Sequence, residues 1–346
     1  MENNKIKPLE IYPFYVDFAI TYNCNAQCQH CSINADFNEK YNRRDMSTEE
    51  IYKVIDELKE MGVLFVGLTG GEAITREDIY KIIDYCVACD MFVALATNGI
   101  AITDSVVKEL KKHKLGNLFV SLDHYEESIH NKIRGNDRAY MAALNCIDIC
   151  QKNDLPITVG ITPMKDNFCD IGENIEFIVG LGVKVINISN FVPTGRGTIS
   201  LDLQPDEWKN VYLQIREKMK KYNGTVRFQI HDVKVPLLMP ELEVQTLGEY
   251  KGCLAGYTHC YILPNGDVNP CVMLPIMLGN LKKESLKNII ERYQRERDIL
   301  NKEKLKGHCK DCRFKYLCGG CRANAYAYYH DPNAQDPHCW IKGENL

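Results

Sequence analysis

Residues 15–31 read YVDFAITYNCNAQCQHC, a short β-rich run that leads into three closely spaced cysteines. The run combines β-branched and aromatic residues, which is typical of a strand. Cys24, Cys28 and Cys31 follow it with three and then two residues between them. Such a loop can place three thiolates around one iron–sulfur cubane and leave the fourth iron without a protein ligand, since ordinary clusters take four cysteines. A zinc knuckle short of one ligand, or chance, would give the same triplet.

The segments that follow alternate between strand-like and helix-like patterns up to about residue 222. Ser47 and Glu50 form a capping-box pattern at the start of an amphipathic helix, which Gly62 ends. Further strands are predicted at 64–68, 92–96, 117–122, 157–161 and 183–188, and further helices at 76–89, 104–112, 138–151, 174–181 and 205–222. Apolar strands separated by helices predict parallel βαβ units. Six of them form either an incomplete relative of the eight-fold barrel or an open sheet, with functional residues at the C-terminal strand ends.

Composition excludes several classes of protein. The 346 residues, 45% hydrophobic and 25% charged, suit about two globular domains. A net charge of −4 offers no polycationic surface, so we expect neither nucleic acid nor a membrane as a partner. No apolar run approaches the roughly 20 residues of a membrane helix, and the first residues are too polar for a signal peptide. We therefore expect a cytoplasmic protein, in which 16 cysteines favour metal binding over disulfides.

A second group of cysteines lies near the C-terminal end. Its eight members are Cys253, Cys260, Cys271, Cys309, Cys312, Cys318, Cys321 and Cys339. Eight thiols divide evenly into two sites of four ligands. The two CxxC pairs within this group have zinc-knuckle spacing, but only five residues separate them, against about 15–20 in a zinc ribbon. From spacing alone, two zinc sites and two iron–sulfur clusters both remain open.

The N-terminal cysteine triplet and the turn after the next strand resemble the radical S-adenosylmethionine (radical SAM) superfamily. The triplet is similar to its CxxxCxΦC loop, with His30 at the aromatic position, and Gly70-Gly71-Glu72 is similar to its GGE motif. The segments GCLAGYTHC, LPNGDVNPC, CKDCRFKYLCGGC and HC resemble the SPASM extension of the same superfamily. The resemblance implies an α/β fold with a partial (β/α)6 TIM-like barrel over residues 1–225, a bridging segment over 226–252 and a cysteine-rich SPASM domain over 253–346.

The resemblance also implies S-adenosylmethionine and three [4Fe–4S] clusters as cofactors. Cys24, Cys28 and Cys31 would hold the cluster that binds SAM. Auxiliary cluster I would take Cys253, Cys260, Cys271 and Cys321, and auxiliary cluster II would take Cys309, Cys312, Cys318 and Cys339. Because two residues separate Cys318 from Cys321 where the commonest pattern has three, an exchange of Cys321 and Cys339 between the clusters is the alternative. If all eight bind, neither auxiliary cluster has an open iron, which favours an electron relay.

Other residues match positions that contact SAM in this family. Gly70 and Gly71 would allow close backbone approach, and the Glu72 region would meet the ammonium group. Arg134 matches a position that pairs with the SAM carboxylate, which suits a guanidinium fork. Ser121 and Asp123 would contact the ribose of SAM, and Val192 would lie where backbone groups contact the adenine. Asn98 would contact SAM at a part that the resemblance does not specify. Ordinary explanations exist as well. Gly70 and Gly71 would form a tight βα turn, and Glu72 would be a charge favoured at a helix N-terminus. Ser121, Asp123 and Asn98 would be turn formers or N-caps, and Arg134 would be half of a surface ion pair.

The chemistry implied is reductive cleavage of SAM to a 5′-deoxyadenosyl radical that removes hydrogen from an unactivated C–H bond. Because the family's SPASM members mostly modify ribosomal peptides, we expect a peptide substrate. The alternatives are radical decarboxylation or oxidation of a tetrapyrrole side chain and, in a different class, a non-enzymatic iron–sulfur carrier or scaffold. A first strand at residue 15 leaves no room for a peptide-binding domain before it. Either a separate partner protein presents the peptide, or the barrel recognises it alone, or the substrate is not a peptide. A reductase such as flavodoxin or ferredoxin would supply the electron.

Some residues keep two interpretations each. Val272, where the sulfatase-maturing branch typically has aspartate, argues against formylglycine formation. Cys169 follows the fifth strand, at the rim expected to face substrate, and would be either an idle thiol or the hydrogen-atom donor of an epimerase. Arg196, in a Gly-Arg-Gly turn, would take a substrate carboxylate or lie in solvent. The four cysteines within predicted helices are expected to be small core residues: Cys86, Cys89, Cys146 and Cys150.

Overall fold

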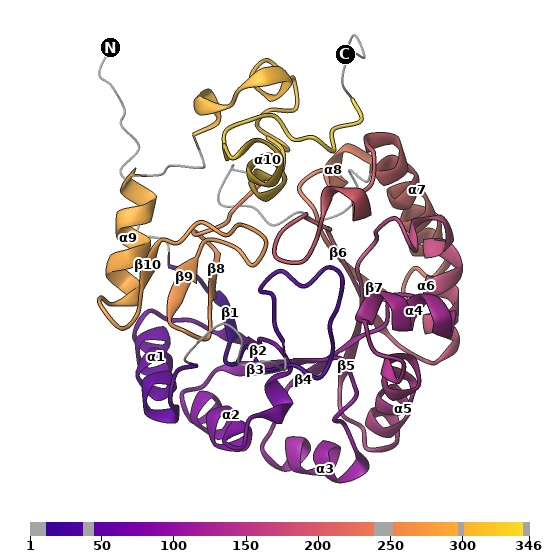
Figure 1. Ribbon diagram of the computed structural model, residues 1–346, viewed down its shortest axis with the longest axis vertical. Helices are drawn as coiled ribbons and strands as arrows, with labels where there is room; N and C mark the ends of the chain where they lie inside the picture. Colours follow the sequence, from indigo (N-terminus) through magenta and orange to yellow (C-terminus); the bar gives the residue numbers. More distant parts are fainter. Residues whose placement is uncertain (1–11, 37–44, 239–251, 297–300, 342–346) are drawn as a thin grey trace.

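The computed structural model describes residues 12–36, 45–238, 252–296 and 301–341. Within them, ten strands form one sheet in the order β10-β9-β8-β1-β2-β3-β4-β5-β6-β7. Seven strands lie in chain order and are parallel: β1 (Tyr15–Ala19), β2 (Phe65–Thr69), β3 (Phe92–Thr97), β4 (Asn117–Ser121), β5 (Ile157–Ile161), β6 (Val185–Ser189) and β7 (Arg227–His231). The sheet curves around a central space and helices cover its outer side (Figure 1). The expected partial barrel of six βα units is confirmed, and β7 extends its sheet past residue 225.

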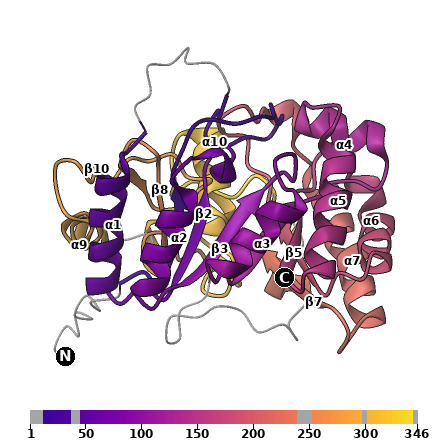
Figure 2. The same cartoon turned by 90° about the horizontal axis from the view of Figure 1, so that it is seen from below.

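The helices of the barrel follow the strands in alternation. They are α1 (Thr48–Glu60), α2 (Ile79–Ala88), α3 (Asp104–Lys112), α4 (Glu127–Arg134), α5 (Ala139–Lys152), α6 (Ile171–Gly180) and α7 (Pro205–Lys221). In the turned view of Figure 2, α4 to α7 lie together at one end and α1 and α2 at the other. The predicted capping box begins α1: Ser47 Oγ accepts from the Glu50 amide at 3.2 Å, and Glu50 Oε2 accepts from the Ser47 amide at 2.8 Å. Within the described ranges, no helix combines the length and apolar character needed to cross a membrane.

The C-terminal part of the chain extends the sheet beyond β1. β8 (His259–Ile262) pairs in parallel with β1, and β9 (Asp267–Asn269) and β10 (Gly279–Asn280) continue the sheet in antiparallel fashion. α8 (Val235–Leu238) follows β7, α9 (Leu286–Glu296) lies beside α1, and α10 (Arg322–Tyr329) lies over the open side of the barrel (Figure 1). The sequence did not predict β8 to β10, because strands of two to four residues show almost no hydrophobic period.

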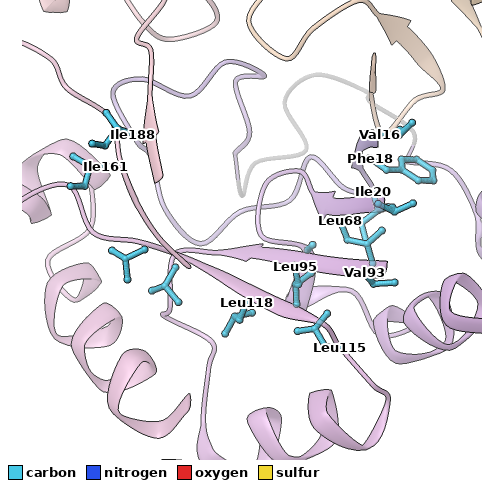
Figure 3. Packing of buried hydrophobic residues seen from close by; sticks show 14 of the residues in the cluster. Val16, Phe18, Ile20, Leu68, Val93, Leu95, Leu115, Leu118, Ile161 and Ile188 are labelled. Atoms are coloured by element: carbon cyan, nitrogen blue, oxygen red, sulfur yellow. The ribbon is translucent and has the colours of Figure 1, made fainter. Parts of the chain in front are cut away.

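The two faces of the parallel strands carry different side chains. Phe18, Leu68, Leu95 and Leu118 occupy registered positions on four neighbouring strands and are fully buried against the helices (Figure 3). The alternate residues, which face the interior of the barrel, include the small or polar Asp17, Gly67 and Ala94 and the aromatic Phe119. The apolar face therefore builds the core, whereas the inner face leads to the carboxyl ends of the strands, where a site is expected.

Candidate active site

The N-terminal cysteine loop lies across the carboxyl ends of the strands, in the centre of Figure 1. The Gly71 amide donates to Thr21 O at 2.7 Å, and the Glu72 amide donates to Asn23 O at 2.8 Å. A Cβ atom on Gly71 would lie 2.1 Å from Asn23 O, and one on Gly70, which has φ +139°, would lie 2.4 Å from Thr21 O. The two glycines therefore allow the turn after β2 to approach the start of the cysteine loop closely.

The three thiols of this loop lie together. Cys24 is buried, Cys28 and Cys31 are partly exposed, and all three pack in one small cluster with Ala19 and Ala26. Burial, followed by smaller effects of neighbours that include Cys28 and Cys31, raises the pKa of the Cys24 thiol to about 12. Because ligation requires thiolates, the Cys24 thiol would release its proton when iron binds. The chemistry of this donor set fits an iron–sulfur cluster held by three cysteines.

A buried ion pair stands beside the loop. Arg134 Nε, at the end of α4, lies 2.6 Å from Asp123 Oδ2, and Arg134 Nη1 lies 3.8 Å from Cys28 Sγ. Asp123 Oδ1 also accepts from the Thr162 amide at 3.0 Å. Burial acts to raise the pKa of Asp123, but the charge of Arg134 outweighs it and the pKa lies below its ordinary value. The residues expected to contact SAM separately thus form one unit, in which Asp123 orients a charged guanidinium beside the cysteine loop.

Glu72 follows the two glycines and is buried. Its Oε1 accepts from Thr97 Oγ1 at 2.5 Å, and its Oε2 accepts from the Asn98 amide at 2.9 Å. Burial raises the pKa of Glu72 to about 7. Asn98 Nδ2 in turn donates to Asn25 Oδ1 at 2.7 Å, which ties the end of β3 to the cysteine loop. Both predicted residues therefore support the loop through contacts within the protein.

Arg196 corrects an expectation from the sequence. Its Nε donates to Cys28 O at 2.9 Å, its Nη1 donates to Ala35 O at 2.5 Å, and its amide donates to Cys31 O at 2.9 Å. Gly195 has φ +62°, and a Cβ there would lie 2.2 Å from Cys31 O. The turn after β6 therefore fastens the cysteine loop, and its arginine is neither in solvent nor free for a substrate carboxylate. The Gly-Arg-Gly sequence after the predicted strand was the signal from which this contact could have been predicted.

The remaining candidates of the barrel are less tightly grouped. Burial lowers the pKa of His30 to about 4, so its ring is neutral at pH 7. Ser121 ends β4 and is partly exposed, and Cys169 is exposed in the short turn before α6. Val192 is buried against Leu274 and Ala323 of the C-terminal part, together with Cys271 and Cys321. This valine therefore marks where the barrel meets the second cysteine region.

The four cysteines expected to hold auxiliary cluster II line one cavity: Cys309, Cys312, Cys318 and Cys339. Lys234 and Asp336 line it as well. In the part of the chain that the structure describes, no three His, Cys, Asp or Glu side chains lie close enough to hold a single metal ion. Thiols that surround a cavity suit a cubane, because each thiolate of a cubane binds a different iron.

Of the cysteines expected at auxiliary cluster I, the structure groups three. Cys253 and Cys271 pack against Ala255 and Tyr293, and Cys271 and Cys321 pack against Leu274 and Ala323. Cys260 lies on β8, with 1% of its surface exposed, and belongs to the main hydrophobic core, although Asp17 acts electrostatically on both Cys260 and Cys271. The structure thus places Cys253, Cys271 and Cys321 in adjoining small clusters and Cys260 in the main core.

Buried cations surround the two cysteine groups of the C-terminal part. Arg322 is 1% exposed and donates to the carbonyl oxygens of Gly319, Gly320, Pro332 and Ala334. Burial lowers the pKa of Lys302 to about 8, against the opposing effects of nearby thiols that include Cys253 and Cys318. Buried charge is costly unless it is compensated. Thiolate-ligated clusters are anionic and would add to the compensation of these charges. The spacing of the cysteines did not signal either cation.

Comparisons with known proteins agree with this geometry. Residues 18–178 match the radical SAM superfamily, and residues 253–313 match an iron–sulfur cluster-binding domain of the SPASM type. The chain is 30% identical over 337 residues to an AdoMet-dependent heme synthase of Methanosarcina barkeri, covering 94% of this chain and 96% of that protein. A protein of the same name from Oleidesulfovibrio alaskensis is 24% identical, covering 94% and 86%.

Solved structures of the same fold include two SPASM-type radical SAM enzymes. Streptococcus suis SuiB bound to S-adenosylmethionine has a TM-score of 0.76 at 20% identity and covers 95% of this chain and 77% of SuiB. The enzyme anSMEcpe with bound AdoMet has a TM-score of 0.72 at 16% identity and covers 94% of both chains. At these identities the likeness concerns the fold.

Proposed function

The chain belongs to the radical SAM superfamily and carries a SPASM domain, and from this premise we propose that it decarboxylates a propionate side chain of a haem-type tetrapyrrole. As a radical SAM enzyme it uses S-adenosylmethionine and iron–sulfur clusters. The observation that carries the proposal is the 30% identity to a heme synthase across 94% of the chain. The peptide substrate that we expected first is supported by fold likeness at 20% identity or less, so the tetrapyrrole takes precedence.

The reaction needs a radical source and an electron acceptor. When bound, the cofactors supply a 5′-deoxyadenosyl radical, which would take one hydrogen atom from the propionate β-carbon, so that CO2 and one electron leave and a vinyl group remains. Electron exit through the C-terminal part would use the region where Val192 packs against Cys271 and Cys321.

The chain's own residues would position SAM. Arg134, held by Asp123 beside Cys28, would bind the SAM carboxylate through its remaining donors. Both carboxylate oxygens of Glu72 already accept from Thr97 and Asn98, so the SAM ammonium group would be met by the backbone of residues 70–72. The proposed ligands of the SAM-binding cluster are Cys24, Cys28 and Cys31. A flavodoxin- or ferredoxin-type reductase and a cytoplasmic location suit a protein whose thiols must stay reduced.

The test uses protein reconstituted anaerobically with iron and sulfide. Supplied with SAM, dithionite and an iron porphyrin that bears only methyl and propionate side chains, it should form one 5′-deoxyadenosine for each propionate converted to vinyl. Mass spectrometry of the porphyrin should show the loss of CO2 and two hydrogen atoms each time. Three cubanes predict about twelve irons per chain.

The matched control replaces Cys24, Cys28 and Cys31 together by alanine. It should keep about eight irons and form no deoxyadenosine. If the wild-type protein cleaves SAM but leaves the porphyrin unchanged, and instead alters the mass of a short peptide, the tetrapyrrole proposal is wrong and peptide modification is right. If it binds only zinc and cleaves no SAM, the non-enzymatic scaffold remains.

A further inference from the structure

A short turn in the C-terminal part buries one lysine and exposes another. Residues Lys302–Lys304 form a 3₁₀ turn, which begins at Asn301, whose side-chain oxygen accepts from the Glu303 amide at 3.0 Å. Residues three apart lie on the same face of such a turn. Lys302 and Leu305 are three apart and are 4% and 3% exposed, whereas Lys304 is exposed. The turn therefore directs the Lys302 side chain into the protein and the Lys304 side chain into water.

The ammonium group of Lys302 lies where two cysteine-bearing segments meet. A Cβ atom on Gly319 would lie 2.2 Å from Lys302 Nζ, and one on Gly252 would lie 2.9 Å from the same atom. The Cβ atom on Gly252 would also lie 2.4 Å from Cys318 O, so the two segments touch. Gly252 directly precedes Cys253, and Gly319 directly follows Cys318. The ammonium group thus lies against the backbone beside one cysteine from each segment.

The two cysteines beside this ammonium group belong to different clusters in the expected ligand sets. Cys253 is expected at auxiliary cluster I and Cys318 at auxiliary cluster II, and an exchange of Cys321 and Cys339 would leave both assignments unchanged. Burial lowers the pKa of Lys302, and the charges that oppose this effect include those of Cys253 and Cys318. One buried cation therefore interacts with the ligands of both clusters.

We propose that Lys302 is a counter-charge shared by the two auxiliary clusters and that it raises the reduction potential of both. A reduced cluster carries one more negative charge than the oxidised cluster, so a nearby ammonium group stabilises the reduced form more strongly. Net charge and solvent exposure are among the properties that set the potential of an iron–sulfur cluster. Lys302 would thus help both clusters to accept the electron that the proposed decarboxylation releases.

The inference rests on the proposed function only for the presence of the two clusters. Its test needs neither porphyrin nor SAM, so a failure of the porphyrin assay and a failure of this inference are separate results. The protein is the full chain with Cys24, Cys28 and Cys31 replaced by alanine, which should keep about eight irons in the auxiliary clusters. It is reduced stepwise under anaerobic conditions, and electron paramagnetic resonance follows the two midpoint potentials.

In this background, Lys302→Met should shift both midpoint potentials to more negative values. At a given potential the ratio of reduced to oxidised cluster should fall about ten-fold for each, which is a shift of about 59 mV for a one-electron couple. A shift of one potential alone would show that the charge serves a single cluster and would overturn the shared role. Two unchanged potentials would overturn the inference altogether.

Two control variants in the same turn separate charge from structure. Lys304→Met removes an equal charge from the exposed side, where water and salt screen it, and should leave both potentials unchanged. Leu305→Ala loosens the buried side of the turn without a change of charge and should also leave them unchanged. If either control shifts the potentials as far as Lys302→Met does, the ammonium group is not the cause and the inference is wrong.

Two further substitutions of Lys302 guard against a variant that fails to bind iron. Lys302→Gln keeps a polar group in the buried site and removes the charge, so it should reproduce the negative shift of both potentials. Lys302→Arg keeps the charge and should hold both potentials near those of the unsubstituted lysine. A shift in Lys302→Arg as large as that in Lys302→Gln would overturn the inference.

Discussion

The guanidinium of Arg134 lies 2.6 Å from the carboxylate of Asp123, and both side chains are buried beside the cysteine loop. Removing one partner of a buried pair leaves an uncompensated charge, which costs about 3–5 kcal/mol. Asp123→Asn should therefore lower the free energy of unfolding by that order and weaken SAM binding at least about ten-fold. Chemical denaturation and anaerobic calorimetry measure the two effects.

The control for this prediction is an exposed ion pair on α5. Lys152 lies 2.6 Å from Asp148, with 71% and 57% of the two side chains exposed. Because surface ion pairs contribute about 0–1 kcal/mol, Asp148→Asn should change stability little and leave SAM binding unaltered. Equal losses in the two variants would contradict the role given to the buried pair.

A methyl group on Gly71 should displace the cysteine loop. The added Cβ would lie 2.1 Å from Asn23 O, so the backbone just before Cys24 must move. Gly71→Ala should reduce the iron content from about twelve to about eight per chain and abolish deoxyadenosine formation. Gly180→Ala is the control, because a Cβ there meets nothing within 4 Å and alanine favours a helix. A full complement of iron in Gly71→Ala would show that the close approach is dispensable.

Stability should fall as the pH rises through neutrality because of Glu72. Burial raises its pKa to about 7 in the folded protein, against about 4.3 in an unfolded chain. The folded state binds the proton more tightly, so this stabilisation is complete below about pH 4.3 and is lost as the pH rises through about 7. Between about pH 6 and pH 8 the free energy of unfolding should fall by about 1 kcal/mol more in the wild type than in Glu72→Gln.

The comparison isolates one carboxyl group. The amide introduced by Glu72→Gln does not titrate, and other buried acids such as Asp17 contribute equally to both proteins. Urea denaturation at the two pH values gives the slopes. Identical slopes in the wild type and the variant would mean that Glu72 is already ionised at pH 6.

Loss of the Arg196 side chain should weaken the attachment of the cysteine loop to the turn after β6. Arg196→Met removes the donors to Cys28 O and Ala35 O, and unsatisfied buried carbonyls cost about 1–3 kcal/mol each. The SAM-binding cluster should then be lost several-fold faster to a chelator, as followed by its absorbance. Arg227→Met is the control, because Arg227 is exposed at the start of β7. If the cluster is lost at the same rate in Arg196→Met as in the wild type, this arginine does not stabilise the cysteine loop.

Segments with strong local signals matched the structure closely. The helix predicted at 104–112 and the strand predicted at 157–161 have those bounds in α3 and β5. α4 was missed, because its buried face carries His130 and Arg134 beside a single apolar residue, Ile133. That face serves the site rather than the core, and a hydrophobic period cannot reveal it.

The sequence alone predicted the fold class from the alternation of strands and helices, and its resemblance to the radical SAM superfamily predicted the cofactor chemistry, because the motifs that carry both are local properties of a chain. Tertiary structure decided what depends on distant partners. It paired Arg134 with Asp123, placed Arg196 against the backbone of Cys28, and placed Cys260 in the main hydrophobic core. The last result depends on the register between β8 and β1, strands more than two hundred residues apart, which sets the face on which each side chain lies.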